Sequence, residues 1–414
     1  MKKFKIFYFL AILCAAILAF WGGSLYAADC PIKIGGLAPL SAPGAVTGGE
    51  AMRDAMNIAV DEINAQGGVL GCQVQLIVAD TEGLPEKGTA VMEKLISQDN
   101  VVAVGGGYHS SVGVAAGRVA HNRHVPVVFA ETWSDEITNS ELPEVFRIAP
   151  LSSEVADFQS KFATTVPGVK KVAMIVENTD FGRPNAEASV KVLEKAGIKS
   201  VMFTVDIGTQ DFVGIVERMK AQNPDMIFVI LTGEASYNFV QQAADAGIGP
   251  QNLPMLCDQV ALESKAYWTN VPDGNFGFMM RVGLPPQLYN DVAKSFVESY
   301  KKRTGKKVPE SYAFEAYDSI RILAQAIREA GSTDPEAIIS ALENIKYEGA
   351  LGTITFPYNR SNPPEKNNLD PKWWHQFPEP AVTMVQYQKS GEDSTEAPVV
   401  YPAKYKTGDP VFVK

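Results

Sequence analysis

The stretch VVAVGGGYHSSVGVAAGRVAHNRHVPVVFA, residues 101–130, contains two short apolar runs separated by a glycine-rich loop and a segment of small residues. The apolar runs predict buried strands, and the segment that starts at Ser110 predicts a helix between them. Successive strands joined by a helix are typical of a parallel sheet with helices packed on its faces. This stretch therefore predicts an α/β fold.

The same alternation extends in both directions along the chain. Strands are expected at IKIGGLA (32–38) and VQLIVAD (74–80), and a second series includes KKVAMIVE (170–177), SVMFTVDI (200–207) and DMIFVILT (225–232). Two such series predict two doubly wound parallel-sheet lobes. We assign residues 28–149 plus 283–356 to lobe 1, residues 150–282 plus 357–391 to lobe 2, and residues 392–414 to a C-terminal tail.

The N-terminus has the features of a secretory signal peptide. Lys2, Lys3 and Lys5 precede an apolar run, and small residues around Ala27 provide a cleavage site, so residues 1–27 are expected to be removed. The chain has 37 Lys and Arg against 47 Asp and Glu, and no stripe of basic and aromatic residues. The sequence thus predicts an exported, acidic protein that does not bind nucleic acid.

Cys30 and Cys72 each stand just before an apolar strand, in CPIKIGGLAPL and CQVQLIVAD. If these strands are parallel neighbours, the two cysteines lie close together, and an oxidising compartment favours a disulfide between them. Cys257, inside PMLCDQV, is expected to be a buried thiol.

The glycine-rich loop GGGYHSS, residues 105–111, is a candidate anion site because helix N-terminal N–H groups lack intrahelical partners. It fails as a dinucleotide fingerprint, since Ser110 stands where the third glycine should be, and it lacks the Gly-Lys ending of a P-loop. A simple tight turn is the alternative interpretation. The dispersed histidines His109, His121 and His124 are expected to be solvated or capping residues, and no metal or cofactor is expected.

Several longer motifs, taken in order, resemble one known family. They are IKIGGLAPLSAPGA, AMNIAVDEINAQGGVLG, GGGYHSSVGVAAG followed by HVPVVFA, ENTDFGRP, and AYDSIRILAQAIREAGSTDPEAIISALE followed by GALGTITF. Their order and spacing resemble the type I substrate-binding proteins of ABC importers, in the branched-chain amino acid-binding class. The resemblance implies two lobes joined by a three-strand hinge. It also implies a monomeric, periplasmic receptor that bends at this hinge, closes on a small polar solute and delivers it to a membrane permease.

The resemblance also implies positions for the ligand. Ser110, with Ser111 beside it, would bind a ligand carboxylate, and Tyr108 would pack on the ligand. The loop from Glu131 through Thr132 to Trp133 would donate backbone groups, while Phe181 in the second lobe would cover the ligand. Asp258 would take the ligand ammonium, with Glu234 as a competitor.

The aromatic residues of this expected pocket leave the ligand open. A site containing Tyr108, Trp133 and Phe181 fits an aromatic or planar acid as well as an aliphatic amino acid. A secreted hydrolase is disfavoured, because the Ser pair lacks the glycine pattern of a nucleophile elbow, and no enzyme activity is expected. A sensor protein that partners a membrane kinase would share this fold and site, so it stays as the alternative.

Overall fold

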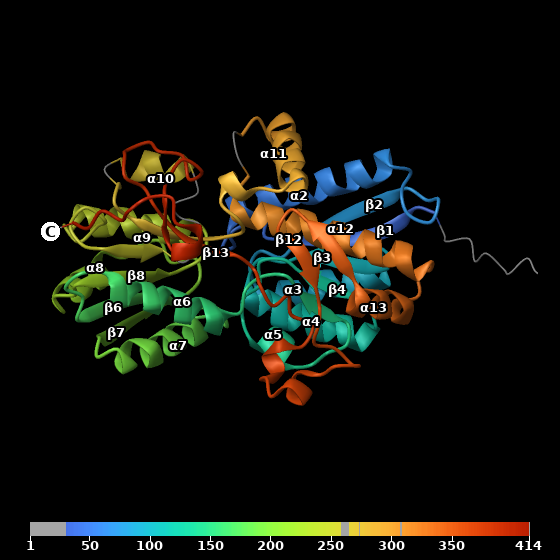
Figure 1. Cartoon of the computed structure of the whole chain (residues 1–414), viewed down its shortest axis with the longest axis horizontal. Coiled ribbons are helices and arrows are strands. Elements are labelled where there is room, and N and C mark those ends of the chain that lie inside the picture. The colour runs from blue at the N-terminus through green and yellow to red at the C-terminus, as the bar shows by residue number, and fades with distance from the viewer. Residues whose placement is uncertain (1–29, 258–264, 273, 307–308, 414) are drawn as a thin grey trace, which may run out of the picture.

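The computed structural model describes residues 30–257, 265–272, 274–306 and 309–413, which form two α/β lobes lying side by side (Figure 1). The expected signal peptide lies outside the described residues. Within the described ranges, no helix combines the length and apolar character needed to cross a membrane. The expectation of two doubly wound parallel-sheet lobes is confirmed.

The first lobe is built on a five-stranded parallel sheet in the order β2-β1-β3-β4-β5. Its strands are β1 (Ile32–Ala38), β2 (Val74–Asp80), β3 (Ala103–Gly106), β4 (Val127–Phe129) and β5 (Val145–Arg147). Its helices are α2 (Val46–Ala65), α3 (Pro85–Ser97), α4 (Ser110–Arg123), α5 (Glu136–Asn139), α11 (Asp291–Thr304), α12 (Ser311–Ala330) and α13 (Pro335–Asn344). Apolar side chains of α2, α11, α12 and α13 fill one core, and those of α3 and α4 fill another, so helices cover both faces of the sheet.

The second lobe contains a seven-stranded sheet in the order β14-β13-β10-β9-β8-β6-β7. Its strands are β6 (Lys171–Glu177), β7 (Lys199–Val205), β8 (Met226–Ile230), β9 (Met255–Cys257), β10 (Phe278–Val282), β13 (Val382–Gln386) and β14 (Val399–Tyr401). Its helices are α6 (Ser152–Thr165), α7 (Gly182–Lys195), α8 (Val213–Lys220), α9 (Glu234–Asp245) and α10 (Lys265–Asn270). Strands β6 to β10 pair in parallel, whereas β13 and β14 extend the sheet in antiparallel pairing.

Short elements complete the chain. The hairpin β11 (Lys346–Gly349) and β12 (Gly352–Thr355) follows α13, and the 3-10 helices are η2 (Pro286–Leu288), η3 (Pro364–Asn367), η4 (Pro371–Trp373) and η5 (Ala403–Tyr405). The segment expected to be a tail contributes β14, so its backbone is held in the second sheet by hydrogen bonds with β13.

The Pro- and Asn-rich segment 357–380 packs against the first lobe for most of its length. Gln376 forms a β-bridge with Arg147 of β5, His375 stacks on Phe146 at a ring-centroid distance of 3.9 Å, and η4 lies beside α5 (Figure 1). The sequence-based division placed residues 357–391 with the second lobe. In the structure the chain returns to the second lobe between this segment and β13, so we place the third crossover near residues 378–381.

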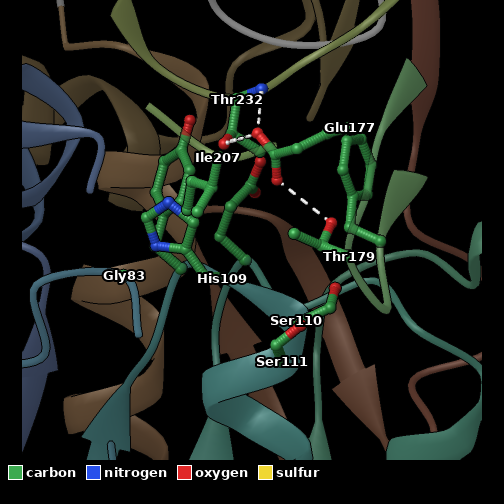
Figure 2. A pocket seen from close by; sticks show the side chains of 11 residues that line it. Gly83, His109, Ser110, Ser111, Glu177, Thr179, Ile207 and Thr232 are labelled. Atoms are coloured by element: carbon green, nitrogen blue, oxygen red, sulfur yellow. Dashed lines mark hydrogen bonds between the residues drawn. The ribbon is translucent and has the colours of Figure 1, made fainter. Parts of the chain in front are cut away.

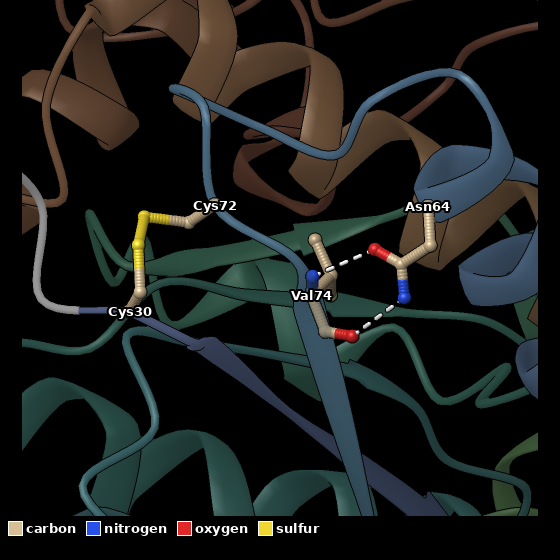
Figure 3. The surroundings of a disulfide bond; sticks show 4 residues. All are labelled: Cys30, Asn64, Cys72 and Val74. Atoms are coloured by element: carbon tan, nitrogen blue, oxygen red, sulfur yellow. Dashed lines mark hydrogen bonds between the residues drawn. A yellow bond between two sulfur atoms is a disulfide. The ribbon is translucent and has the colours of Figure 1, made fainter.

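The disulfide between Cys30 and Cys72 is present, with a Cα–Cα distance of 5.3 Å (Figure 3). The register explains it, since Ile32 of β1 pairs with Val74 of β2 and each cysteine precedes its strand by two residues. Beside it, the Asn64 amide donates to the carbonyl oxygen of Val74 at 2.8 Å and accepts from its N–H at 2.7 Å. These contacts fix the end of α2 to the start of β2. Cys257 is buried at the end of β9, as expected.

Candidate functional site

A cavity lies between the two lobes at the carboxyl ends of their strands, where ligands bind in open α/β sheets (Figure 2). The first lobe contributes Gly83, Tyr108, His109, Ser110, Ser111 and Glu131. The second lobe contributes Glu177, Thr179, Phe181, Ile207 and Thr232.

The glycines of the β3–α4 loop allow this wall of the cavity to form. Gly106 and Gly107 have φ values of +84° and +90°, a region that residues with a Cβ rarely adopt. A Cβ on Gly106 would also lie 2.6 Å from the carbonyl oxygen of Leu37. The loop therefore turns sharply from β3 into α4 and brings Tyr108, His109 and Ser110 to the cavity.

Ser110 is the first residue of α4, and His109 before it occupies the N-cap position without a capping hydrogen bond from its side chain. Its hydroxyl oxygen accepts hydrogen bonds from the N–H groups of Trp133 and Ser134, both at 3.1 Å. Because both acceptor positions are used, the hydroxyl proton is left to donate. Ser110 thus fixes the loop after β4 and presents a donor at the start of α4.

Arg147 also holds the loop after β4. Its side chain is fully buried, and one guanidinium nitrogen donates to the carbonyl oxygens of Thr132 and Ser134. Another nitrogen donates to the Gln376 side-chain oxygen at 2.6 Å. Burial lowers the pKa of Arg147 to about 10, so it stays charged at neutral pH. The role of Arg147 could not be predicted from the sequence, because its partner Gln376 is distant in the chain.

Three contacts join the lobes around the cavity. The N–H and hydroxyl of Thr47, in α2, donate to one carboxylate oxygen of Glu234, in α9, at 3.1 and 3.0 Å. The Asp180 N–H donates to the Ser111 hydroxyl oxygen at 3.1 Å, and the rings of Trp133 and Phe181 meet edge to face at 5.9 Å. The structure therefore shows the lobes in contact.

The residues expected to bind the ligand fall into three groups. Tyr108, Ser110, Ser111, Glu131 and Phe181 line the cavity together. Thr132, Trp133 and Glu234 are outside its lining, where they support the loop or join the lobes. Asp258 lies outside the described residues.

Two polar side chains of the cavity were not expected from the sequence. Glu177, the last residue of β6, is buried, and its carboxylate accepts from the N–H and hydroxyl of Thr232 and from the hydroxyl of Thr179 (Figure 2). Burial raises the pKa of Glu177, although these hydrogen bonds partly offset the shift. The only signal in the sequence is its place at the end of a strand.

His109 is the second of these side chains, and its expected solvated or capping role is wrong. Only 4% of His109 is exposed, and neither ring nitrogen has a hydrogen-bond partner among the described residues. Burial lowers its pKa to about 3, so the ring is neutral at physiological pH. One ring nitrogen of a neutral imidazole donates and the other accepts, so His109 can make two different hydrogen bonds to a solute.

Comparison with known proteins agrees with this architecture. The family model described as "Periplasmic binding protein" matches residues 31–365. The chain belongs to this family of periplasmic binding proteins.

Individual members of the family are similar over most of the chain. An amino acid binding protein of Pseudomonas aeruginosa is 28% identical over 343 residues, covering 82% of this chain and 90% of the relative. The Leu/Ile/Val-binding protein homolog 7 of Brucella abortus is 28% identical over 368 residues, covering 84% and 90%.

Solved structures share the fold at lower sequence identity. A leucine binding protein of Thermotoga maritima matches with a TM-score of 0.75 at 21% identity, covering 87% of this chain and 96% of that one. A solute binding protein of Rhodopseudomonas palustris, solved with 3,4-dihydroxy benzoic acid, matches with a TM-score of 0.73 at 21% identity, covering 92% and 98%. One is described as a leucine binding protein and the other was solved with an aromatic acid, so the fold alone does not select a ligand for this periplasmic binding protein.

Proposed function

We propose that this protein is the solute receptor of an ABC importer and captures a small carboxylate-bearing solute between its lobes. The observation that supports this most directly is the start of α4, which opens into the interlobe cavity with Ser110 and Ser111 in the lining. The first N–H groups of a helix lack intrahelical partners and carry the positive end of its dipole. A carboxylate placed there would receive N–H and hydroxyl hydrogen bonds together.

Closure of the two lobes strengthens the binding of a solute at such a site. The contacts from Thr47 to Glu234 and from Asp180 to Ser111 exist only when the lobes are together, so closing would exclude water from the cavity. Hydrogen bonds to a charged group contribute about 1.5–3 kcal/mol each, against about 1 kcal/mol for neutral pairs. Capture by closure therefore suits a charged, polar solute.

The remainder of the proposal rests on family membership and on the N-terminal sequence. A periplasmic binding protein with a signal peptide at residues 1–27 would act outside the inner membrane as a monomer and pass its solute to an ABC permease. The named relatives are an amino acid binding protein and a Leu/Ile/Val-binding protein homolog, and one structural neighbour was solved with 3,4-dihydroxy benzoic acid. The protein would act by binding alone, without enzymatic chemistry.

A thermal-shift screen of the mature protein against amino acids, aromatic acids and short-chain carboxylates tests this function. A compound that stabilises the folded protein at low concentration is expected among them, by mass action. Absence of any stabilising carboxylate would contradict the proposal.

The variant Ser110→Ala then tests the position of the carboxylate. Calorimetry should show affinity for the compound from the screen weakened about ten- to hundredfold, since one charged hydrogen bond and the loop it orders are lost. Ser152→Ala is the matched control, because Ser152 is also a buried serine that begins a helix, and it does not line the cavity. Equal affinity in both variants would mean that the carboxylate binds elsewhere.

A further inference from the structure

A second cavity lies where the chain crosses between the lobes, and we call it the crossover cavity. Its walls include Pro150, between β5 and α6, and Pro378 and Pro380, at the third crossover. Its volume is about 310 Å³, and none of its described lining residues also lines the cavity at the strand ends. Small-molecule sites have volumes of roughly 300–1,000 Å³ and are common at domain interfaces. The crossover cavity is therefore large enough for a small organic compound.

Aromatic rings line the crossover cavity from both lobes. Phe158 of α6 and Tyr401 of β14 belong to the second lobe, and their ring centroids are 5.1 Å apart. Trp373 and Phe377 come from segment 357–380, which packs against the first lobe. Aromatic rings attract other planar rings in offset or edge-to-face geometry. The lining therefore favours a flat, apolar occupant.

The charged side chains of this cavity disfavour an anion. Glu154 and Asp157 each bring a carboxylate, and Lys161 brings the one ammonium group among its described lining residues. The Lys161 Nζ atom lies 2.6 Å from an Asp157 carboxylate oxygen, so its charge is already paired. Lys372, beside the lining, places its Nζ atom 3.3 Å from a Glu154 carboxylate oxygen and is paired as well. A negatively charged compound would have to displace one of these carboxylates, whereas a neutral or cationic compound would not.

Much of the aromatic wall lies outside the part of the chain that the family model matches. That match ends at residue 365, whereas Trp373, Phe377 and Tyr401 all follow it. The crossover cavity therefore depends on the C-terminal part of this chain, and it is separate from the cavity at the strand ends.

The shape of the crossover cavity depends on how the lobes are arranged, because its walls belong to both. Gln376, one of its lining residues, accepts a hydrogen bond from Arg147 at 2.6 Å and donates to the carbonyl oxygen of Ala149 at 2.7 Å. Lys372 of η4 donates to the Ser153 hydroxyl of α6 at 2.7 Å. These contacts hold the two walls together in the arrangement where the lobes meet. A compound that fits this arrangement better than an open one stabilises it.

We propose that the crossover cavity is a second binding site, for a planar aromatic compound that carries no negative charge. Its ring contacts the rings of Phe158 and Trp373, and an amine on the ring lies beside the Glu154 carboxylate. The bound compound favours the arrangement in which the lobes are in contact, since it touches both. This site needs no carboxylate on its occupant, so it does not depend on the proposed function.

Indole, tryptamine and indole-3-acetate are matched probes, because they share one ring system and carry no charge, a positive charge and a negative charge. Calorimetry on the mature protein should show that indole binds and that tryptamine binds up to about fivefold more tightly. Trp373→Ala should weaken both about tenfold, because an aromatic face is lost. Trp268→Ala is the matched control, since Trp268 is also a partly buried tryptophan and lines neither cavity.

A charge reversal keeps the result interpretable if Trp373→Ala fails to fold. Glu154 is exposed, so Glu154→Lys should fold, weaken tryptamine binding about five- to tenfold and leave indole binding unchanged. Glu187→Lys, at an exposed position of α7, makes the same reversal away from the cavity and should change neither affinity.

Small-angle scattering tests the effect of the site on the lobes. With saturating tryptamine, the radius of gyration should equal the value calculated for the arrangement in which the lobes are in contact. A larger value would show that the occupant does not hold the lobes together, and it would overturn this part of the inference.

The remaining outcomes decide the site itself. If neither indole nor tryptamine binds, or if Trp373→Ala and Glu154→Lys leave their affinities unchanged, the second site is overturned. Binding of indole-3-acetate that Trp373→Ala weakens would overturn the requirement for charge. Indole and tryptamine carry no carboxylate, so these results leave the proposed function standing, and failure of the carboxylate screen would leave this site standing.

Discussion

Glu234 was expected only as a competitor of Asp258 for the ligand ammonium, and the structure gives its carboxylate a partner in the other lobe. The N–H and hydroxyl of Thr47 both donate to it, at 3.1 and 3.0 Å, and both residues are half-buried. Hydrogen bonds to a charged acceptor are worth about 1.5–3 kcal/mol when buried, and solvent at this position reduces their value. We take about 1–2 kcal/mol for the pair of bonds together.

These bonds form only in the closed arrangement, so their loss should act through closure. If the unliganded protein is mostly open, Glu234→Ala should weaken the apparent affinity by the full amount, about five- to thirtyfold. Thr47→Val removes the hydroxyl and keeps the N–H donor, so about two- to fivefold is expected. The melting temperature of the unliganded protein should hardly change.

Calorimetry on the single and double variants, with the compound found by screening, measures these effects. Once the acceptor is gone, the Thr47 hydroxyl has nothing to donate to, so the double variant should bind like Glu234→Ala alone. Glu217→Ala, exposed on α8, controls for the loss of a charge in the second lobe. Additive effects would refute the closure mechanism, and so would a loss above a hundredfold in Glu234→Ala with none in Thr47→Val, which would indicate direct contact with the ligand.

Three other perturbations test the scaffold. Cys30→Ser opens a loop with a sequence separation of 42 residues and should cost about 2–4 kcal/mol in urea unfolding, and reduction of the wild type should cost the same. Burial raises the pKa of Asp318 to about 7 from 3.8, so the native state holds a proton that the unfolded state releases. Wild-type stability should therefore fall between about pH 4 and 7, and Asp318→Asn should remove that slope in unfolding measured at several pH values. Gly49→Ala would place a Cβ 1.7 Å from the carbonyl oxygen of Pro39 and should lower the unfolding free energy by more than about 2 kcal/mol, whereas Gly214→Ala, with open space around it, should not.

Local patterns were enough to predict the sheets and the disulfide. Alternating apolar runs and amphipathic helices predict the parallel topology, because the apolar residues of each βα unit indicate which of its faces are buried. Cys30 and Cys72 could be paired because both precede strands, and parallel strands that start together place such residues side by side. These predictions depend only on short stretches of chain.

The site could be predicted only where one strand end supplies it. Tyr108 and Ser110 follow directly from the β3–α4 turn, but the roles of His109, Glu177 and Glu234 depend on how two lobes meet. His109 is buried beside Gly83 and Tyr108, and a single polar residue after a glycine run does not indicate in the sequence that its side chain is buried. Glu177 is a lone acidic residue at the end of a strand, and the sequence does not indicate that Thr179 and Thr232 hold its carboxylate.

The contacts of the Pro- and Asn-rich segment 357–380 could not be predicted from the sequence, because its partners lie far away in the chain. Its Gln376 accepts from Arg147, 229 residues earlier in the chain, and Arg147 in turn donates to the carbonyl oxygens of Thr132 and Ser134. The N–H groups of Trp133 and Ser134 then donate to Ser110 at the cavity. A segment that reads as a surface loop is therefore connected, through one buried guanidinium, to the residue that presents a donor to the solute. Each step satisfies a buried polar group that would otherwise be costly, so these contacts together stabilise the position of the loop after β4.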